Sequence, residues 1–437
     1  MIFFYNMVMV IAAVLLLPLI LPAILASGKL RRTFPYRLGL KALPDAIDHP
    51  EVCKNRKGPV WVHALSVGEV LSAVPLVKEL KNKVENHAVF FSVSTLTGYE
   101  VACRRLTGIV DAIFFYPYDF AFTVRWLVKK ISPSLVVIVE TDIWPNFLNE
   151  LTRRQAPVVL VNARLSKRSF VGYKRIAFFF RWVFSGFAKI CAQSDLDAER
   201  FRRLGIPSRR IVVTGNVKFD QNDDPVSDEQ LQRWRRRLKV GPGKKVWLAG
   251  STHEGEEAVV RDVFIRLLRN RTDMTLIVAP RDPRRVPGVA RLFREAGIAA
   301  ALASRPPSND GESPADVFIV DTIGDLRTLY ALADMAFIGG SLAGCGGHNP
   351  LEPAAFSKPV LFGPDMSDFA VIAQMLIESG GALRVRDAEG LFAAVAMLMD
   401  NRLKAEEMGR NASRVFCENK GAVARILEII LNELFNK

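Results

Sequence analysis

The chain has 437 residues, 50% hydrophobic and 24% charged, with a formal net charge of +14 at pH 7. This length exceeds what one hydrophobic core usually serves and indicates at least two domains. The composition excludes disordered and collagen-like proteins, and five scattered cysteines without a CxxC pair indicate reduced thiols in a cytosolic compartment rather than a disulfide framework.

Residues 1–27 form an almost unbroken apolar run, followed at once by Lys29, Arg31 and Arg32. A helix needs about 20 apolar residues to cross the hydrocarbon core. The positive-inside rule then predicts a single-pass anchor over residues 1–28, with the rest of the chain in the cytoplasm. A helix lying in the membrane interface, a buried helix and a cleaved segment are the alternatives.

The positive charge is concentrated beside this run. Residues 29–218 hold 31 Lys and Arg against 15 Asp and Glu, a balance of +16, whereas residues 219–437 have a balance of −2. A basic half is typical of proteins that meet nucleic acid, anionic lipid or a phosphorylated substrate, although a generic solvated surface is also possible. Next to an anchor, an anionic lipid of the inner membrane is favoured over nucleic acid.

Short apolar runs alternate with amphipathic helical segments along the remaining chain. In the first half they fall at residues 60–64, 88–93, 112–116, 134–140, 157–162, 190–193 and 211–214. In the second half they fall at 245–249, 275–279, 317–321, 335–338 and 360–362. This alternation predicts parallel βαβ units, hence two doubly wound α/β domains over residues 29–218 and 219–437 that face each other across a cleft. The last helix, 421–434, is compatible with packing on either half.

Acidic residues follow two predicted strands of the first half. Glu69 falls in the first turn of a helix after strand 60–64, a position that suits a general base or merely complements the helix dipole. Glu140 and Asp142 follow strand 134–140, where burial requires a compensating charge. Lys218 and Arg164 are the candidate partners, and a purely structural ion pair is the alternative.

Glycine-rich segments follow strands of the second half. The segment 344–353 enters a predicted helix, with Asn349 fitting its cap and Pro350 its first position. We expect free backbone N–H groups there to bind an anion, and Glu352 to hold ribose hydroxyls. The segments 250–256 and 279–282 are further loops at strand ends on the same side of the predicted sheet.

Taken in order, these segments resemble the 3-deoxy-D-manno-octulosonic acid (Kdo) transferases of Gram-negative bacteria. The resemblance covers nearly the whole chain and rests on the motifs RxGL (37–40), HxxSVGE (63–69), ETDIWPN (140–146), NARLSxRS (162–169), TGNxKFD (214–220), GSTHEGEE (250–257) and GGHNPLEPA (346–354). It implies the two-domain GT-B fold, with an acceptor-binding first domain and a CMP-Kdo-binding second domain. It also implies transfer of Kdo from CMP-Kdo to the 6′-hydroxyl of the lipid A precursor (lipid IVA) in lipopolysaccharide biosynthesis.

The resemblance also implies residue roles. Glu69 matches the family's proton acceptor, and Glu140 and Lys218 match its transition-state stabilisers. The CMP-binding segments correspond to Pro280, Arg281, Ile323, Gly324, Asp325, Asn349, Pro350, Leu351 and Glu352. Asp325 stands where some relatives carry Glu, so we assign no role to its side chain.

The donor chemistry predicts transfer without a metal or other cofactor. The leaving group is a monophosphate ester, so no diphosphate requires a bridging cation, and no His/Cys/Asp cluster has metal-ligand spacing. A helix N-terminus and Arg281 suit the charge that develops on CMP. A single displacement with inversion needs only one base. The alternatives are a membrane-tethered, non-catalytic scaffold with a degenerate GT-B fold, and another GT-B nucleotide-sugar enzyme such as an epimerase.

Overall fold

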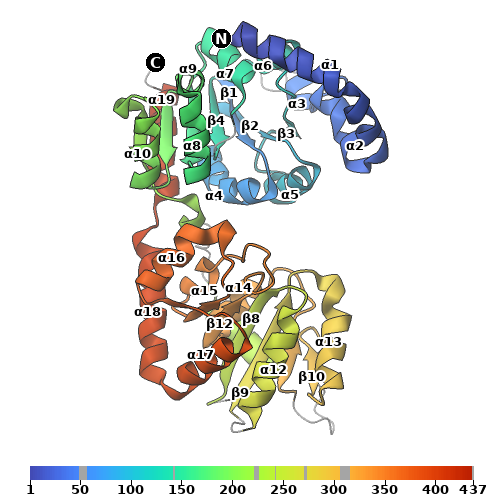
Figure 1. Ribbon diagram of the computed structural model, residues 1–437, viewed down its shortest axis with the longest axis vertical. Coiled ribbons are helices and arrows are strands. Elements are labelled where there is room, and N and C mark those ends of the chain that lie inside the picture. The colour runs from blue at the N-terminus through green and yellow to red at the C-terminus, as the bar shows by residue number, and fades with distance from the viewer. Residues whose placement is uncertain are drawn as a thin grey trace. The chain divides into compact units, whose positions relative to one another are not determined.

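The computed structural model describes residues 1–48, 57–140, 143–220, 226–241, 243–269, 273–305 and 315–435. It divides the chain into two compact units (Figure 1). Unit 1 comprises residues 1–221 and 420–437, and unit 2 comprises residues 222–419. Each unit is a parallel sheet covered by helices on both faces, which is the α/β architecture predicted from the alternating runs.

The sheet of unit 1 has seven parallel strands in the order β3-β2-β1-β4-β5-β6-β7. Its strands are β1 (Lys57–Ala64), β2 (His87–Val93), β3 (Ala112–Phe115), β4 (Leu135–Val139), β5 (Val158–Ala163), β6 (Lys189–Ala192) and β7 (Ile211–Val213). Its helices are α1 (Ile2–Ala26), α2 (Gly28–Arg37), α3 (Asp45–Asp48), α4 (Val67–Lys83), α5 (Leu96–Leu106), α6 (Ala121–Ile131), α7 (Pro145–Arg153), α8 (Lys167–Arg175), α9 (Ala177–Phe184), α10 (Asp195–Arg203) and α19 (Ala422–Phe435), with a 3-10 turn η3 (Val217–Asp220).

Burial on both faces explains the near-continuous hydrophobic runs of the central strands. Every residue of β2 and β4 is buried, as expected for parallel strands with helices on either side. On one face Trp61 of β1 packs with Phe147 and Phe184 of the covering helices. On the other face Phe91 of β2 packs with side chains of α4 and α19. Polar side chains that serve a ligand are therefore expected at the ends of these strands, where helices begin.

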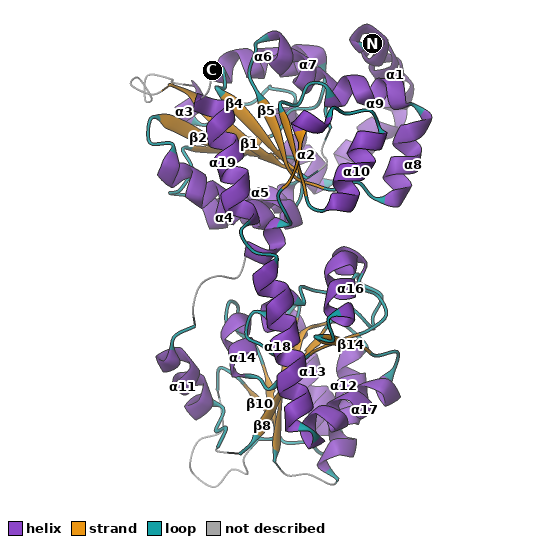
Figure 2. Ribbon diagram, turned by 90° about the vertical axis from the view of Figure 1, so that its left-hand side faces the viewer, coloured by secondary structure: helices purple, strands orange, loops and turns teal. Residues whose placement is uncertain are grey.

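The last helix, α19, lies in unit 1 although the preceding residues belong to unit 2 (Figure 2). The Asp220 carboxylate accepts hydrogen bonds from the backbone N–H groups of Gly421 (2.7 Å) and Val423 (2.6 Å). The Arg425 side chain donates to the Thr214 carbonyl at 2.8 Å. Asp220 thus caps α19, because an acceptor at a helix start satisfies otherwise unpaired N–H groups.

Helix α1 is apolar on all sides and its span Ile2–Leu19 is not buried against the protein. Its first turn is nevertheless attached to unit 1. The Tyr5 hydroxyl donates to the Asp119 carboxylate (3.0 Å), and the Asn146 amide donates to the Asn6 side chain (2.7 Å). A helix that is hydrophobic all round and exposed to water would be unfavourable, so this surface is suited to lipid.

Unit 2 holds a second seven-stranded parallel sheet in the order β10-β11-β9-β8-β12-β13-β14. Its strands are β8 (Lys245–Thr252), β9 (Met274–Pro280), β10 (Ala300–Leu302), β11 (Val317–Ile319), β12 (Met335–Ile338), β13 (Val360–Phe362) and β14 (Ala382–Arg384). Its helices are α11 (Asp228–Arg237), α12 (Glu256–Leu268), α13 (Val286–Glu295), α14 (Leu326–Leu332), α15 (Leu351–Ala354), α16 (Ala370–Glu378), α17 (Ala388–Asp400) and α18 (Arg402–Glu418). The three-residue edge strands β10 and β14 were not predicted, because neither has a distinctive apolar run.

Candidate active site

The candidate residues of unit 1 lie at the point where the strand order reverses. Strand β1 pairs with β2 on one side and with β4 on the other. In doubly wound sheets ligands bind at such a switch point, outside the carboxyl ends of the strands. Glu69 follows β1 and Glu140 follows β4, so the two carboxylates flank the switch point. Asp142, the other acid of this motif, lies outside the described residues.

Glu69 occupies the third position of α4, and its carboxylate turns back toward the start of the helix. It accepts hydrogen bonds from the Leu65 backbone N–H (2.5 Å) and from the Ser66 hydroxyl (3.4 Å). The Ser66 side chain makes no cap bond of its own. The carboxylate therefore closes the start of α4 in a variant of the capping box, in which the acid accepts from the N–H one residue before the cap residue Ser66. Any chemical role of Glu69 is added to this structural one.

Glu140 stands in a conformation that non-glycine residues rarely adopt. Its φ is +61°, in the left-handed region, and its backbone N–H donates to the Val161 carbonyl at 2.8 Å. Such strain persists only where the surroundings enforce it and tends to cluster at functional sites. Burial raises the pKa of the Glu140 carboxyl above its ordinary value, while the positive charges of Lys218 and Arg164 lower it. The two cations expected as partners thus do act on this acid.

A polar network behind Lys218 was not predicted. Asn162, at the end of β5, is fully buried and has a φ of +54°. Its side-chain oxygen accepts a hydrogen bond from the Val217 N–H (3.2 Å), and its carbonyl accepts one from the Gln193 amide (2.8 Å). The Asn216 side chain donates to Gln193 (3.2 Å) and accepts from the Lys218 N–H (3.0 Å). These bonds fix turn η3, which carries Lys218. The signal for this network in the sequence was asparagine after an apolar strand.

Substitutions at Asn162 can separate the effect of backbone strain on stability from that of the side-chain hydrogen bond. Replacing Asn162 with Ala removes the bond to Val217 and forces a Cβ-bearing residue to keep a left-handed backbone, whereas Gly removes only the bond. We expect the Ala variant to be less stable than the Gly variant by about 1 kcal/mol in urea unfolding. Equal unfolding free energies would show that the backbone at this position carries no strain.

The candidate residues of unit 2 flank an equivalent reversal, because β8 pairs with β9 on one side and β12 on the other. Here the glycine-rich loop after β12 is organised by a buried carboxylate. Glu256 accepts from the N–H groups of Gly340 (2.7 Å), Leu342 (2.9 Å) and Ala343 (3.3 Å), and from that of His253 (2.9 Å). Glu256 thus fixes residues 340–343, directly before the segment 344–353 in which the anion site is expected.

The loop continues into α15, which begins at Leu351 rather than at Pro350. The Asn349 side chain accepts a hydrogen bond from the Leu351 N–H at 3.1 Å and so caps this short turn. Before it, His348 stacks on His253 with an Nε2–Nε2 distance of 2.9 Å. Burial together with the positive charges of Arg281 and His253 lowers the pKa of His348 to about 4. Nearby Arg281 directly follows Pro280, the last residue of β9.

Glu352 lies beside the charges of Arg281 and Arg327. Burial of its carboxyl raises the pKa of Glu352 to about 7, against the opposing effect of these two cations. The Glu352 charge in turn adds to the effect of burial in raising the pKa of Tyr330. The segment 323–325 precedes α14, and Ile323 in it is 88% exposed. A large aliphatic side chain that exposed is suited to cover a flat apolar ligand surface. The structure thus brings Arg281 and Glu352 together and leaves Ile323 exposed on the loop before α14.

The Glu352 pKa predicts how stability depends on pH. Since its folded pKa of about 7 exceeds the ordinary 4.5, folding favours the protonated acid. This contribution is fully present below pH 4.5 and is lost as the pH rises through 7, a loss of about 3 kcal/mol. We expect a Glu352→Gln variant, which mimics the neutral acid, to unfold at higher urea than the parent at pH 8 and alike at pH 4.5. If the urea midpoints of the parent and the variant differ by the same amount at pH 8 and at pH 4.5, the raised pKa of Glu352 is contradicted.

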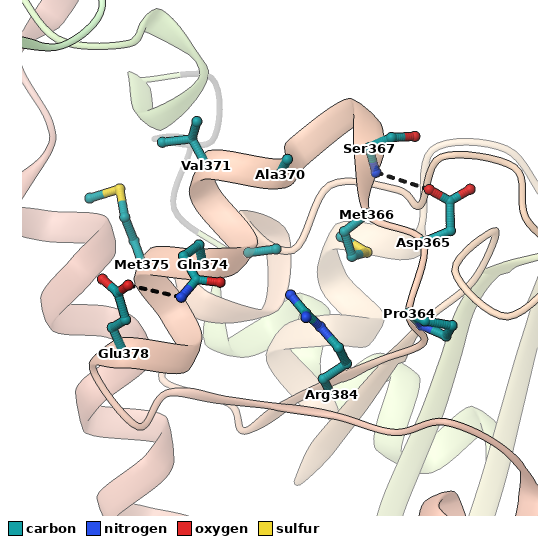
Figure 3. A pocket seen from close by; sticks show the side chains of 11 residues that line it. Pro364, Asp365, Met366, Ser367, Ala370, Val371, Gln374, Met375, Glu378 and Arg384 are labelled. Atoms are coloured by element: carbon teal, nitrogen blue, oxygen red, sulfur yellow. Dashed lines mark hydrogen bonds between the residues drawn. The ribbon is translucent and has the colours of Figure 1, made fainter. Parts of the chain in front are cut away.

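A cavity of about 630 Å³ borders the glycine-rich loop and was not anticipated (Figure 3). It lies between residues 364–367 and α16, with Arg384 of β14 beside both. Asp365 joins it to the loop, because its carboxylate accepts from the Gly346 N–H at 2.8 Å. The signal available in the sequence was Gly-Pro-Asp at 363–365, directly after a strand.

Comparisons with known proteins agree with this organisation. Residues 34–221 match the family model of 3-deoxy-D-manno-octulosonic-acid transferase (kdotransferase). The chain is 32% identical to the 3-deoxy-D-manno-octulosonic acid transferase of Haemophilus influenzae over 98% of this chain and 97% of that one. It is 31% identical to the enzyme of that name from Chlamydia pneumoniae, covering 91% and 89%.

A solved structure with the same fold is the UDP-GlcNAc 2-epimerase from Neisseria meningitidis bound to UDP-GlcNAc. The match covers 86% of this chain and 100% of that chain, with a TM-score of 0.61 and 14% sequence identity. At this identity the likeness concerns the fold alone, which is of GT-B type with two parallel-sheet units. The sequence matches establish the family and the enzyme class. The chain is a glycosyltransferase and belongs to the 3-deoxy-D-manno-octulosonic acid transferase family.

Proposed function

We propose that the protein transfers Kdo from CMP-Kdo to the 6′-hydroxyl of the lipid A precursor lipid IVA in lipopolysaccharide biosynthesis. The names of its relatives support Kdo transfer. The observation that carries the proposal is the pair of carboxylates, Glu69 and Glu140, that flank the switch point of unit 1. The positive charge of Lys218 lowers the pKa of Glu140 against the effect of burial.

The reaction is a single displacement with inversion. The acceptor hydroxyl oxygen attacks the anomeric carbon of Kdo, the bond from that carbon to the phosphate oxygen breaks, and CMP leaves with the electron pair. Glu69 takes the hydroxyl proton as general base. Lys218 and Arg164 oppose the rise that burial causes in the pKa of Glu140. As a carboxylate, Glu140 stabilises the positive charge on the sugar ring, since glycosyl transfer passes through an oxocarbenium-like state.

The donor is held by unit 2. CMP contacts Pro280 and Arg281, the loop 323–325 and the turn 349–352. Arg281 offsets the charge that develops on the departing phosphate, a role supported by the effect of its positive charge on both His348 and Glu352 of the following loop. Because the leaving group is a monophosphate, no metal is needed, and transfer is expected to continue after strict chelation.

The acceptor is guided by unit 1, whose positive balance suits the two phosphates of lipid IVA. Helix α1 anchors the enzyme in the inner membrane, with both units on the cytoplasmic side, as the Lys and Arg after it favour. If α1 crosses the whole bilayer, the hydrogen bond between Tyr5 and Asp119 must break, since about 30 Å of hydrocarbon then separates the two residues. If the bond is kept, α1 lies along the membrane surface.

Removal of α1 tests the anchor. We expect a variant lacking residues 2–26 to move from the membrane fraction to the supernatant at physiological salt, because the remaining basic surface gives only a salt-dependent attraction. The control replaces Tyr5 with Phe, which keeps the apolar helix and should stay with the membrane. A truncated protein that still sediments with membranes at high salt would show that α1 is not the anchor.

The proposal as a whole is tested with purified protein, CMP-Kdo and tetraacylated lipid A precursor, with and without EDTA. We expect mass analysis to show acceptor molecules heavier by whole Kdo units in both samples. Acceptor of unchanged mass would refute the transfer, and product only without EDTA would refute metal independence.

A further inference from the structure

A second cavity, of about 480 Å³, lies in unit 1 along the edge strand β3. Helix α2 and helix α5 form its sides, and residues 42–44 close one end. Its wall is aromatic: the ring of Phe115 stacks on Tyr99 (centroids 4.4 Å apart) and lies 5.7 Å from Tyr36. Leu96 and Leu43 add aliphatic surface, and Arg32 is exposed at the rim. The cavity is thus lined mainly by aromatic and aliphatic side chains, and Arg32 is the one cation among the described residues that line it.

This cavity adjoins the turn that carries Glu69. Helix α5 begins at the carboxyl end of β2, the strand next to β1. In the first turn of α5, a Cβ added at Gly98 would lie in ordinary van der Waals contact with the Ser66 carbonyl carbon, at 3.5 Å. Ser66 is the residue before α4, whose third residue is Glu69. A ligand seated against Leu96 and Tyr99 therefore lies next to the acceptor side of the switch point.

The cavity is also continuous with the membrane-binding part of the chain. One residue, Ser27, separates α1 from α2, and its side chain caps α2. Its far end is fixed to the sheet, because the Arg37 side chain donates to the Tyr116 carbonyl (3.0 Å) and the Arg37 carbonyl accepts from the Tyr118 N–H (3.0 Å). One wall of the cavity is thus a short helix joining the lipid-exposed α1 to the edge of the catalytic sheet.

We propose that this cavity holds one fatty-acyl chain of the acceptor during transfer, with Arg32 facing the anionic head group. The inference rests on the proposed function and assigns the acceptor a binding site for its apolar part. An aromatic and aliphatic wall gains from burying methylene groups, whereas a sugar or free phosphate needs more hydrogen-bonding groups than one arginine and two tyrosine hydroxyls supply. A chain reaching in along α2 from the bilayer keeps the head group beside Glu69.

Filling the cavity tests the assignment by kinetics. Ala42 lines the cavity and is exposed, so Ala42→Trp places an indole there without touching the core. Leu40, 73% exposed in the same segment and outside the cavity lining, gives the matched control Leu40→Trp. Each variant is assayed with CMP-Kdo and two acceptors, tetraacylated precursor and the same bisphosphorylated disaccharide without chains. We expect Ala42→Trp alone to lower kcat/KM at least about tenfold, and only for the acylated acceptor.

The outcomes separate this inference from the proposed function. If the parent protein transfers Kdo but Ala42→Trp affects both acceptors equally, or neither, the acyl site is refuted. If the parent transfers to neither acceptor, the proposed function is refuted. The acyl-chain site is then tested by acceptor binding instead. For this, acceptor with a diazirine at its chain end is photolysed with the protein. We expect labels on residues 96–99 and 113–115. Labels confined to α1, or equal labelling by a diazirine phosphatidylethanolamine, would overturn the assignment.

Discussion

Replacing Glu69 by glutamine is expected to lower kcat by about 10²–10⁴-fold, the usual contribution of a general base. Glutamine cannot take the proton from the acceptor hydroxyl, but its amide oxygen still accepts the hydrogen bond from the Leu65 N–H that closes the start of α4. The thermal midpoint and the affinity for CMP should therefore stay close to those of the parent. Single-turnover transfer, calorimetry and CMP titration measure the three quantities.

An alanine variant serves as the control for the structural role of the same side chain. Alanine removes the cap as well as the base, and loss of a helix cap costs about 0.5–2 kcal/mol of stability. We expect Glu69→Ala to match the glutamine variant in rate but to unfold more readily. A glutamine variant with near-parental turnover would remove Glu69 from the base role and leave it as the cap of α4.

Replacing Lys218 by methionine is expected to have the second-largest effect, a loss of about 10²–10³-fold in kcat. Methionine keeps the length and packing of the side chain but removes the charge that favours ionised Glu140. With burial then opposed by Arg164 alone, the Glu140 pKa rises further. If the reaction requires the carboxylate, the acid limb of the pH–rate profile must move to higher pH.

This shift distinguishes a role through Glu140 from simple loss of a structural contact. Lys218→Arg retains a positive charge at this position and should keep the acid limb near its parental place. A methionine variant that loses rate equally at every pH would contradict the coupling. An unchanged rate would show that Lys218 only supports turn η3.

Much of this architecture could be predicted because it is encoded in local patterns. Buried parallel strands appear in the sequence as continuous apolar runs, so the segments that form β2 and β4 are evident from their residues alone. The short edge strands β10 and β14 of unit 2 lack that signal and were missed. The glycine-rich segment 344–353 was found, but the carboxylate that binds the N–H groups directly before it was not. Glu256 is 84 residues from Gly340 in sequence, and no local pattern reports such a distant partner.

The sequence by itself determined the α/β class, the apolar first helix, the basic first half and, through ordered motifs, the family. Hydrophobic periodicity and motif order are properties of neighbouring residues, so they survive without a fold. Only the tertiary structure decided which strand ends meet. The pairing of β1 with β4 sets Glu69 and Glu140 on either side of the switch point. The bonds from Gly421 and Val423 to Asp220, about 200 residues apart, assign α19 to unit 1. Such contacts depend on strand order and on long-range hydrogen bonds, which local sequence does not encode.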